Sequence, residues 1–374
     1  MTIVAASAAL VCVVAGCGPS DGSEELDLGR KAYELHDLKK AEKLFTECVA
    51  LAPGNADALL YLARIKLEAG DLPAARSWVD KAAQAAAGAV DVRLVSAQVA
   101  WHEKDYGKAA ELFSLVAEDT KLSPELRAQG WTGLGLVEMA NERRHMARIA
   151  FLRAIRLNRR DAAAWYHIGL VYRDKFGYLE AALEQFEIFV RLEAAASPRV
   201  QKTLRSVIPA LKEQIAREAA SRPGVSKRDS AACAASLAKA EAEWKKGSFR
   251  NAREAYAAAL SADPLSYPAA IGLAKAWAKT DATKAGQVKS FENYKLACSL
   301  RPGATSTFLN AGELAARLGY HAQAAEIFSR AVASSPTSIA ALDGLIRALQ
   351  NSGGHKAEAR AYQLYRESIP VKRK

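Results

Sequence analysis

The chain has 374 residues and a formal net charge of +11, and half of its residues are apolar although only 7% are aromatic. Abundant alanine favours helices packed through small side chains over β-sheets, which are rich in valine, isoleucine and aromatics. The basic charge favours anionic partners, but the sequence has no zinc-knuckle spacing, Walker loop or aromatic RNA-binding motif, so we expect no nucleic-acid partner.

The N-terminus begins with an uncharged, mainly apolar run from Ile3 to Ala15. This run is shorter than the ~20 residues of a transmembrane helix, but it has the length of the apolar region of a signal peptide. It ends in Val14-Ala15-Gly16-Cys17, followed by a small, polar stretch. This arrangement resembles the lipobox of bacterial lipoproteins.

The resemblance implies a signal peptide over 1–16, cleavage after Gly16, lipidation of Cys17 and a flexible linker over 17–24. Two acyl chains or more would give stable membrane anchoring. The first three residues contain no Lys or Arg, although signal peptides usually begin with a positive segment. A signal peptide cut elsewhere, or an apolar N-terminus on a cytosolic protein, therefore stays open as an alternative.

A small residue followed four positions later by a large one recurs along the chain at spacings of 34 to 38 residues, with one double interval of 70. Positions i and i+4 lie on one face of a helix, so each pair predicts a helix with a close contact along that face. The pairs are Ala41/Phe45, Ala75/Val79, Ala109/Phe113, Ala147/Phe151, Ala182/Phe186, Ala252/Tyr256, Ser290/Tyr294 and Ala324/Phe328.

A second helical pattern precedes several of these pairs, with turn residues such as Gly70-Asp71 between the two. Its fullest forms are Trp131-x2-Leu134-Gly135 and Trp165-x2-Ile168-Gly169-x2-Tyr172. Together the two patterns resemble the tetratricopeptide repeat, which reads W-x2-L-G-x2-Y, then A-x3-F, then P. The resemblance implies an all-α protein, an α-solenoid of about nine helix-turn-helix repeats in a right-handed superhelix, whose first helices line the concave side.

The domain organisation follows from the phase of the repeats. We expect about five repeats over 25–193 and about four over 230–368, followed by a basic tail over 369–374. The intervening segment 194–229 has the length of one repeat but contains Pro198, Pro209 and Pro223. It is either a degenerate hairpin that continues the stack or a helix and linker between two arrays, and we favour the second because its end has a linker composition.

Any peptide-binding residues should lie on the concave faces of the first helices. A groove that mixes arginine with tryptophan and tyrosine can hold an extended peptide through charge-assisted hydrogen bonds and flat apolar contacts. The carboxylate clamp of chaperone-binding repeats is not reproduced, so we do not expect capture of a C-terminal carboxylate. The candidate groove residues are Arg64, Gln98, Trp101, Tyr166, His167, Arg173, Trp244 and Arg347.

The most basic stretch lies between Glu142 and Arg160, on the expected second helix of the fourth repeat. It could contact an anionic partner or membrane surface, but a solvated helix face with arginine near its C-terminal end is the simpler interpretation. The candidate anionic-contact residues are Arg143, Arg144, Arg148 and Arg156.

No catalytic, cofactor-binding or metal-binding constellation is evident in the sequence. The five cysteines follow no CxxC spacing, and Cys48, Cys233 and Cys298 are expected to pack inside helices. We therefore expect no metal, no cofactor and no enzymatic activity.

The sequence favours a lipid-anchored, periplasm-facing scaffold of the bacterial cell envelope that binds other proteins or peptides. The comparison with lipoproteins that help to assemble envelope machines or recruit peptidoglycan enzymes rests on fold and anchor alone. The alternatives are a cytoplasmic scaffold without lipid and, in another class, the substrate-binding arm of an enzyme.

Overall fold

The computed structural model of the protein describes residues 21–193, 197–221 and 228–370. This part of the chain is built from α-helices and two short π-helical segments and contains no strand. Most consecutive helices pack in pairs, and within each unit many of these pairs pack on the next. The all-α, solenoid-type fold predicted from the sequence is confirmed.

The chain divides into two compact units, one up to Val116 and one from Ala117 onward. The first unit contains three predicted repeats, and its last helix crosses the boundary. Its hairpins are α1 (Ser23–Glu34) with α2 (Leu38–Leu51), α3 (Ala56–Glu68) with α4 (Leu72–Ala85), and α5 (Val90–His102) followed by α6 (Tyr106–Glu118).

The second unit contains the remaining helices, and the predicted spacer 194–229 lies inside it. Its first hairpins are α7 (Pro124–Ala140) with α8 (Arg144–Leu157), and α9 (Ala162–Leu170) and the π-helical η1 (Val171–Phe176) with α10 (Leu179–Leu192). Later hairpins are α13 (Ser230–Lys245) with α14 (Phe249–Ala262), α15 (Tyr267–Thr280) with α16 (Lys284–Leu300), α17 (Thr305–Arg317) with α18 (His321–Ser334), and α19 (Ile339–Asn351) with α20 (Lys356–Glu367).

Short polar side chains set where many of these helices begin. The carboxylates of Asp37, Asp71 and Asp161 accept hydrogen bonds from backbone N–H groups three residues later. Such capping satisfies donors that a helix cannot satisfy itself, and each cap contributes about 1 kcal/mol. The hairpins are therefore delimited by local sequence signals.

The repeated small-to-large pairs form the contact between the two helices of a hairpin. Ala147 and Phe151 of α8 are both fully buried. A Cβ atom added to Gly135 of α7 would lie 2.4 Å from the Phe151 ring, so only glycine lets the ring approach α7 this closely. The same relation holds between Gly169 and Phe186, at 3.0 Å.

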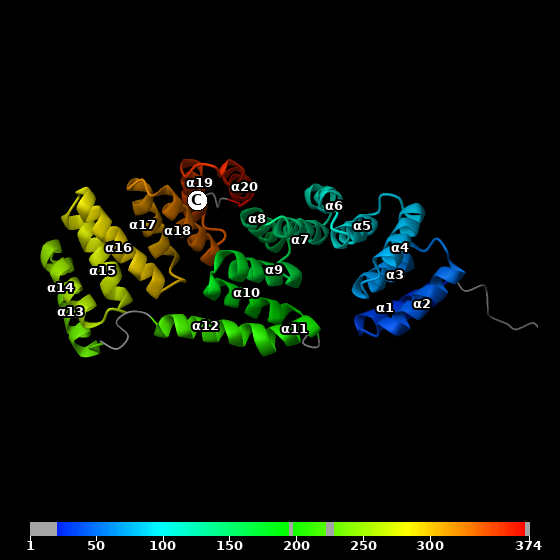
Figure 1. Cartoon of the computed structure of the whole chain (residues 1–374), viewed down its shortest axis with the longest axis horizontal. Coiled ribbons are helices and arrows are strands. Elements are labelled where there is room, and N and C mark those ends of the chain that lie inside the picture. Colours follow the sequence, from blue (N-terminus) through cyan, green and yellow to red (C-terminus); the bar gives the residue numbers. More distant parts are fainter. Residues whose placement is uncertain (1–20, 194–196, 222–227, 371–374) are drawn as a thin grey trace, which may run out of the picture. The chain divides into compact units, whose positions relative to one another are not determined.

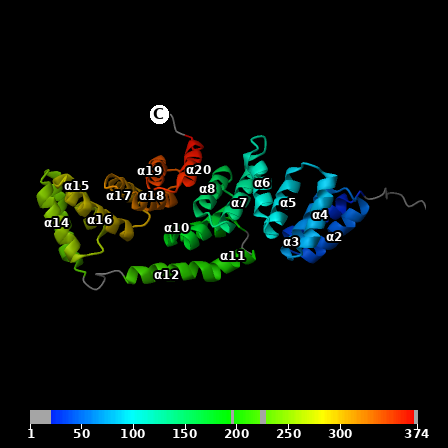
Figure 2. The same cartoon turned by 45° about the horizontal axis from the view of Figure 1, so that its top comes forward.

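The segment between the two predicted arrays is one helical run. It consists of α11 (Pro198–Lys202), the π-helical η2 (Thr203–Val207) and α12 (Ile208–Ala220), and it packs along α10 (Figure 2). Val200 and Leu211 are buried on the side that faces the hairpins. Over residues 197–221 the chain thus forms no second, antiparallel helix.

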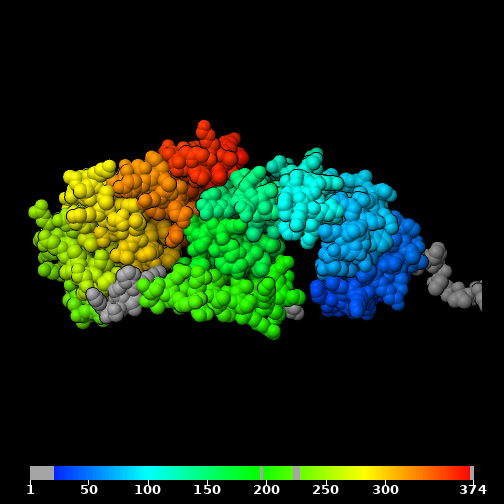
Figure 3. All heavy atoms as spheres, viewed as in Figure 1, coloured from blue at the N-terminus to red at the C-terminus, as the bar shows by residue number. Residues whose placement is uncertain are grey.

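The last repeats of the second unit pack against its middle. Helix α20 contacts α8, although the two are far apart in the sequence (Figure 1). Figure 3 shows the atoms of the last repeat seated against those of the α7/α8 region. One apolar core includes side chains from Ala128 to Ile369. In a linear array each repeat contacts only its neighbours, so the contact between the middle and the last repeats is an addition to that arrangement.

Two predicted segments fall outside the part of the chain that the structure describes. These are Cys17 with the rest of 1–20, and the end of the basic tail, 371–374. Among the helices that are described, none has the length and apolar character needed to span a bilayer.

Candidate functional site

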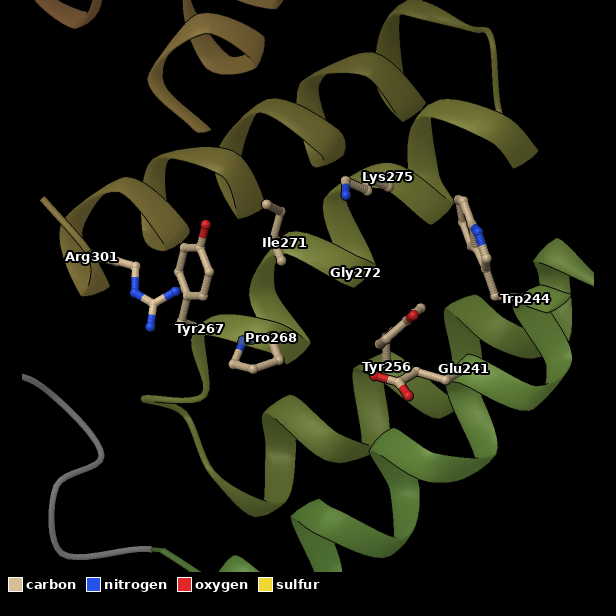
Figure 4. Close-up of a pocket in the computed structure, with 9 residues that line it drawn as sticks. All are labelled: Glu241, Trp244, Tyr256, Tyr267, Pro268, Ile271, Gly272, Lys275 and Arg301. Carbon is tan, nitrogen blue, oxygen red and sulfur yellow. The ribbon is translucent and has the colours of Figure 1, made fainter. Parts of the chain in front are cut away.

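The best-defined candidate site is a cavity of about 370 Å³ between α13 and α15, first helices of consecutive repeats (Figure 4). Aromatic and apolar side chains supply much of the surface, and charged side chains stand around the opening. The lining residues are Glu241, Trp244, Tyr256, Tyr267, Pro268, Ile271, Gly272, Lys275 and Arg301.

Tyr256 of α14 lies below the space between the two first helices (Figure 4). A Cβ atom on Gly272 would lie 2.3 Å from the Tyr256 ring, so the glycine allows α15 to rest on this tyrosine. Trp244 is only half-buried, and its ring makes an edge contact with Phe249 at a centroid distance of 4.9 Å. Part of the Trp244 indole therefore remains available to a ligand.

Arg301 and Tyr267 stand at the opposite end of the cavity from Trp244 (Figure 4). The guanidinium of Arg301 lies over the Tyr267 ring, 4.7 Å from its centroid, and the Tyr267 hydroxyl is 2.7 Å from Thr307 Oγ1. These contacts hold both side chains in place. Neither Arg301 nor Lys275 has a described carboxylate within ion-pair distance.

The spacing of the first helices explains why a cavity forms at this point. First helices of consecutive repeats pack on each other at α3 and α5, and again at α17 and α19. Helices α13 and α15 make no contact of this extent, and α15 packs on α14 and α16 instead. The side chains between α13 and α15 therefore remain accessible.

In the first unit, the predicted groove residues Arg64, Gln98 and Trp101 lie on first helices. Arg64 is half-buried, with its guanidinium 5.5 Å from the centroid of the Tyr61 ring and 4.0 Å from the Asp91 carboxylate. Gln98 is exposed on α5. Trp101 is half-buried, and its Nε1 is enclosed without a hydrogen-bond partner among the described residues.

Tyr166, His167 and Arg173 lie close together on α9 and η1. The rings of Tyr166 and His167 are 5.3 Å apart, and Arg173 pairs with the neighbouring Asp174 at 2.8 Å. His167 stacks on Phe151, and burial lowers its pKa to about 4. The histidine is therefore neutral near pH 7 and serves mainly in packing.

Trp244 lines the α13/α15 cavity, and Arg347 lines another cavity, on α19 and α20. The cavity at Arg347 measures about 320 Å³ and also includes the ion pair of Arg366 with Asp343. The predicted residues are thus spread over several repeats, and their role in binding stays a prediction.

Most of the residues that line the α13/α15 cavity were not predicted from the sequence, including Tyr267, Ile271, Lys275 and Arg301. A signal was present. The stretch Pro268-x2-Ile271-Gly272-x2-Lys275 has the spacing of Trp165-x2-Ile168-Gly169-x2-Tyr172. Lysine thus replaces the buried tyrosine, which indicates a first helix with an open face.

The four arginines of the predicted anionic contact have different environments, and Arg148 requires a correction. Its side chain is fully buried between α8, α18 and α20, so it cannot contact an external anion in this structure. Arg143 is exposed and pairs with Glu138 at 3.5 Å. Arg144 donates to the Lys175 carbonyl at 3.0 Å, and Arg156 donates to the Ser368 carbonyl.

Arg148 is held by neutral acceptors and aromatic rings. Its Nε donates to the Tyr362 hydroxyl at 2.8 Å, and its Nη1 donates to Ser329 Oγ at 2.9 Å. The guanidinium lies 4.7 Å from the centroid of the Phe176 ring, which η1 supplies. These contacts connect α8 to α18 and α20 and explain why the arginine is buried.

No group of three or more His, Cys, Asp or Glu side chains in the described ranges is placed to hold a metal ion. Cys48, Cys233 and Cys298 are buried free thiols, which confirms that they pack inside helices. Burial raises the pKa of Cys298 to about 12, so its thiol is not a nucleophile at neutral pH.

Comparison with known proteins identifies part of this architecture. The family described as tetratricopeptide repeat matches residues 32–88, 132–198 and 237–285. Protein bimA of Emericella nidulans is 30% identical over 165 residues. That match covers 42% of this chain, and the chain spans only 19% of the length of the fungal protein.

Among solved structures, several proteins resemble parts of this chain at low identity. TTC0263, a tetratricopeptide protein of Thermus thermophilus, is 19% identical with a TM-score of 0.44, covering 51% of this chain and 99% of its own. PilF of Pseudomonas aeruginosa is 18% identical with a TM-score of 0.40, covering 54% of this chain and 93% of its own. By the family match, residues 32–88, 132–198 and 237–285 carry tetratricopeptide repeats, and the helical hairpins form an α-solenoid.

Proposed function

We propose that this protein is a non-catalytic scaffold that docks partner proteins in grooves between the first helices of its repeats. Tetratricopeptide repeats suggest an interaction scaffold in general, and the particular groove is the α13/α15 cavity. The observation that carries the proposal is its combination of an accessible tryptophan with two cations that pair with no described carboxylate. Partly exposed aromatics beside free charges are typical of binding hot spots.

A pull-down with groove variants tests this proposal. Trp244→Ala and Tyr267→Ala should both lose proteins that the wild-type chain retains from an envelope extract, because each removes aromatic surface from the cavity. Lys239→Ala, an exposed position on α13 that does not line the cavity, is the matched control. Identical captured proteins for all three variants would contradict a role for this groove.

The same pull-down with Trp101→Ala and Arg173→Ala tests the other predicted groove positions. If only the α13/α15 variants lose partners, binding is confined to that cavity. If all of them lose partners, an extended chain contacts several first helices, as the sequence analysis expects.

The proposed location is the bacterial cell envelope, where a lipid on Cys17 would anchor the scaffold facing the periplasm. The lipobox-like Val14-Ala15-Gly16-Cys17 supports this proposal. A role in envelope assembly or in recruiting peptidoglycan enzymes is the functional setting that we propose for such an anchored scaffold.

Labelling of cells with radioactive palmitate tests the anchor. The wild-type chain should incorporate label and fractionate with membranes, whereas Cys17→Ser should do neither. Cys48→Ser controls for labelling of another thiol. An unlabelled wild-type chain in the soluble fraction would contradict the lipid anchor and favour the alternative of a cytoplasmic scaffold.

A further inference from the structure

We infer that the α13/α15 cavity selects an extended acidic segment of a partner protein, in which an apolar side chain sits next to carboxylates. The apolar side chain would enter between Trp244 and Ile271, and the carboxylates would pair with Arg301 and Lys275. This inference rests on the proposed function and adds the chemistry of the segment that the groove takes.

The size of the cavity suits one large side chain and its neighbours. Its volume of about 370 Å³ is at the lower end of the roughly 300–1,000 Å³ typical of small-ligand pockets. Tyr256 and Gly272 lie beneath it, and Trp244, Tyr267 and Ile271 offer partly exposed apolar surface. An extended peptide can insert a side chain here without any displacement of the helices.

The charge around the cavity indicates an acidic ligand. Arg301 and Lys275 are exposed, and no described carboxylate pairs with either. Residues 228–301 contain 12 Lys or Arg against 7 Asp or Glu, a net charge of +5. This excess attracts acidic segments from a distance and disfavours basic ones.

The charges along the cavity are not symmetric, because Lys275 stands between Ile271 and Trp244 whereas Arg301 stands at the far end (Figure 4). Arg301 is held over the Tyr267 ring at one end, whereas Glu241 and Trp244 come from α13 at the other (Figure 4). A ligand carboxylate near Arg301 gains a partner, but a carboxylate near Glu241 is repelled. The acidic residues should therefore lie mainly on the Arg301 side of the apolar residue, away from Glu241.

Labelled nonapeptides can test this preference by fluorescence anisotropy with the full chain. Each peptide has a central phenylalanine in a serine-glycine background, flanked on one side by two Asp, two Asn or two Lys. We expect the Asp peptide to bind at least fivefold tighter than the Asn peptide and the Lys peptide to bind weakest. Raising the salt concentration should reduce the difference, because exposed charges are screened.

Variants assign the effect to the cavity. Trp244→Ala should weaken binding of the Asp and Asn peptides about tenfold, as for truncation of an interface aromatic. Arg301→Gln and Lys275→Gln should each lower affinity for the Asp peptide by about threefold, as for an exposed ion pair. Lys239→Gln is the control and should bind like wild type. The double variant Arg301→Glu/Lys275→Glu should prefer the Lys peptide.

The outcomes separate this inference from the proposed function. Equal affinity for the Asp, Asn and Lys peptides, all lost in Trp244→Ala, would overturn the acidic preference and leave the groove as a docking site. The acidic preference would also be overturned, and the groove would remain a docking site, if no peptide bound but wild type captured envelope proteins that Trp244→Ala did not. If peptides and proteins were both insensitive to Trp244→Ala, both proposals would fail.

A membrane surface is the competing anionic ligand. Phosphatidylglycerol vesicles that bind wild type and Trp244→Ala equally, and that displace the Asp peptide, would show a surface attraction and overturn the inference. Failure of these vesicles to compete at the same salt concentration would support the peptide.

Discussion

Single glycines in the first helices set how closely the two helices of a repeat approach. Gly135 and Gly169 each face a buried phenylalanine of the following helix, Phe151 and Phe186. Glycine normally destabilises a helix by about 1 kcal/mol relative to alanine. Here that cost is offset by close packing of a whole aromatic ring, which a side chain at the same position would displace.

Gly135→Ala should therefore lower the free energy of unfolding of the second unit by about 1 kcal/mol. Overpacking a core costs about 1–3 kcal/mol, and the better helix propensity of alanine recovers part of that. Urea-induced unfolding measures the difference. Gly54→Ala is the control, because a Cβ atom there meets nothing within 4 Å. Equal stability of Gly135→Ala and wild type would contradict the packing role of the glycine.

At the scale of the elements, helix α8 connects three repeats of the second unit. It packs on α7 in its own hairpin, on α9 of the next repeat and on α20 of the last. Arg148 crosses the contact with α18 and α20 through Ser329 and Tyr362. A buried cation without a carboxylate is costly, so its hydrogen bonds and ring contacts must be kept together.

Arg148→Ala should destabilise the second unit by about 3 kcal/mol, because it leaves a cavity and removes hydrogen-bond donors to Tyr362 and Ser329. Hydrogen exchange should rise in α18 and α20 and stay unchanged in α1 to α4. Arg148→Met, which fills much of the space without charge, should recover most of the loss. Arg143→Ala is the exposed control and should change stability by less than about 0.5 kcal/mol.

His145 gives the same contact a pH dependence. Its Nδ1 lies 3.1 Å from the Tyr362 hydroxyl, whose oxygen already accepts from Arg148, so we assign the tyrosine proton to the bond with the histidine. That bond needs a neutral imidazole. Burial, together with the charges of Arg148 and Arg144, lowers the pKa of His145 to about 3.

The stability that neutral His145 provides should be complete above the unfolded pKa of about 6.5 and should be lost as the pH falls toward 3. In that window the unfolded chain binds a proton that the folded chain does not. This costs about 1.4 kcal/mol per pH unit. Urea unfolding at pH 7.5, 6 and 5 measures this effect. The free energy of unfolding should fall less between pH 7.5 and pH 5 for His145→Gln than for wild type. Parallel curves would contradict the assignment.

At the scale of the whole molecule, the chain consists of two compact units with separate apolar cores. The cores around Phe45 and Val79 belong to the first unit. The large core around Phe151, Phe186 and Phe328 belongs to the second. In repeat proteins the free energy of unfolding is approximately the sum of contributions from each repeat and from each contact between neighbouring repeats. A mutation in one core should therefore destabilise only the repeats around it.

Phe45→Ala should destabilise the first unit by about 3–5 kcal/mol. Hydrogen exchange should increase in α1 to α4, with no change in α15 to α18. Phe328→Ala should have the reverse effect. If exchange rose equally throughout the chain for either variant, the two units would unfold as one.

The repeats were predictable because a helical hairpin is encoded locally. Caps such as Asp71 and pairs such as Ala147 with Phe151 act within a few residues of each other, and their spacing is visible in the sequence. The lining of the candidate site was less visible, since Trp244 was found but Tyr267, Lys275 and Arg301 were not. These residues come from two repeats, and the looser contact between α13 and α15 cannot be derived from either repeat alone.

The sequence by itself determined the helices, their pairing and the small-to-large contacts within each repeat. Only the tertiary structure decided which helix faces remain open and which are covered. It buried Arg148 against Ser329 and Tyr362, which are 181 and 214 residues away. An arginine on a helix looks solvated in the sequence because the residues that would cover it lie on other helices. The burial of a charged side chain on the outer face of a hairpin depends on the packing of distant elements, and local periodicity carries no information about that packing.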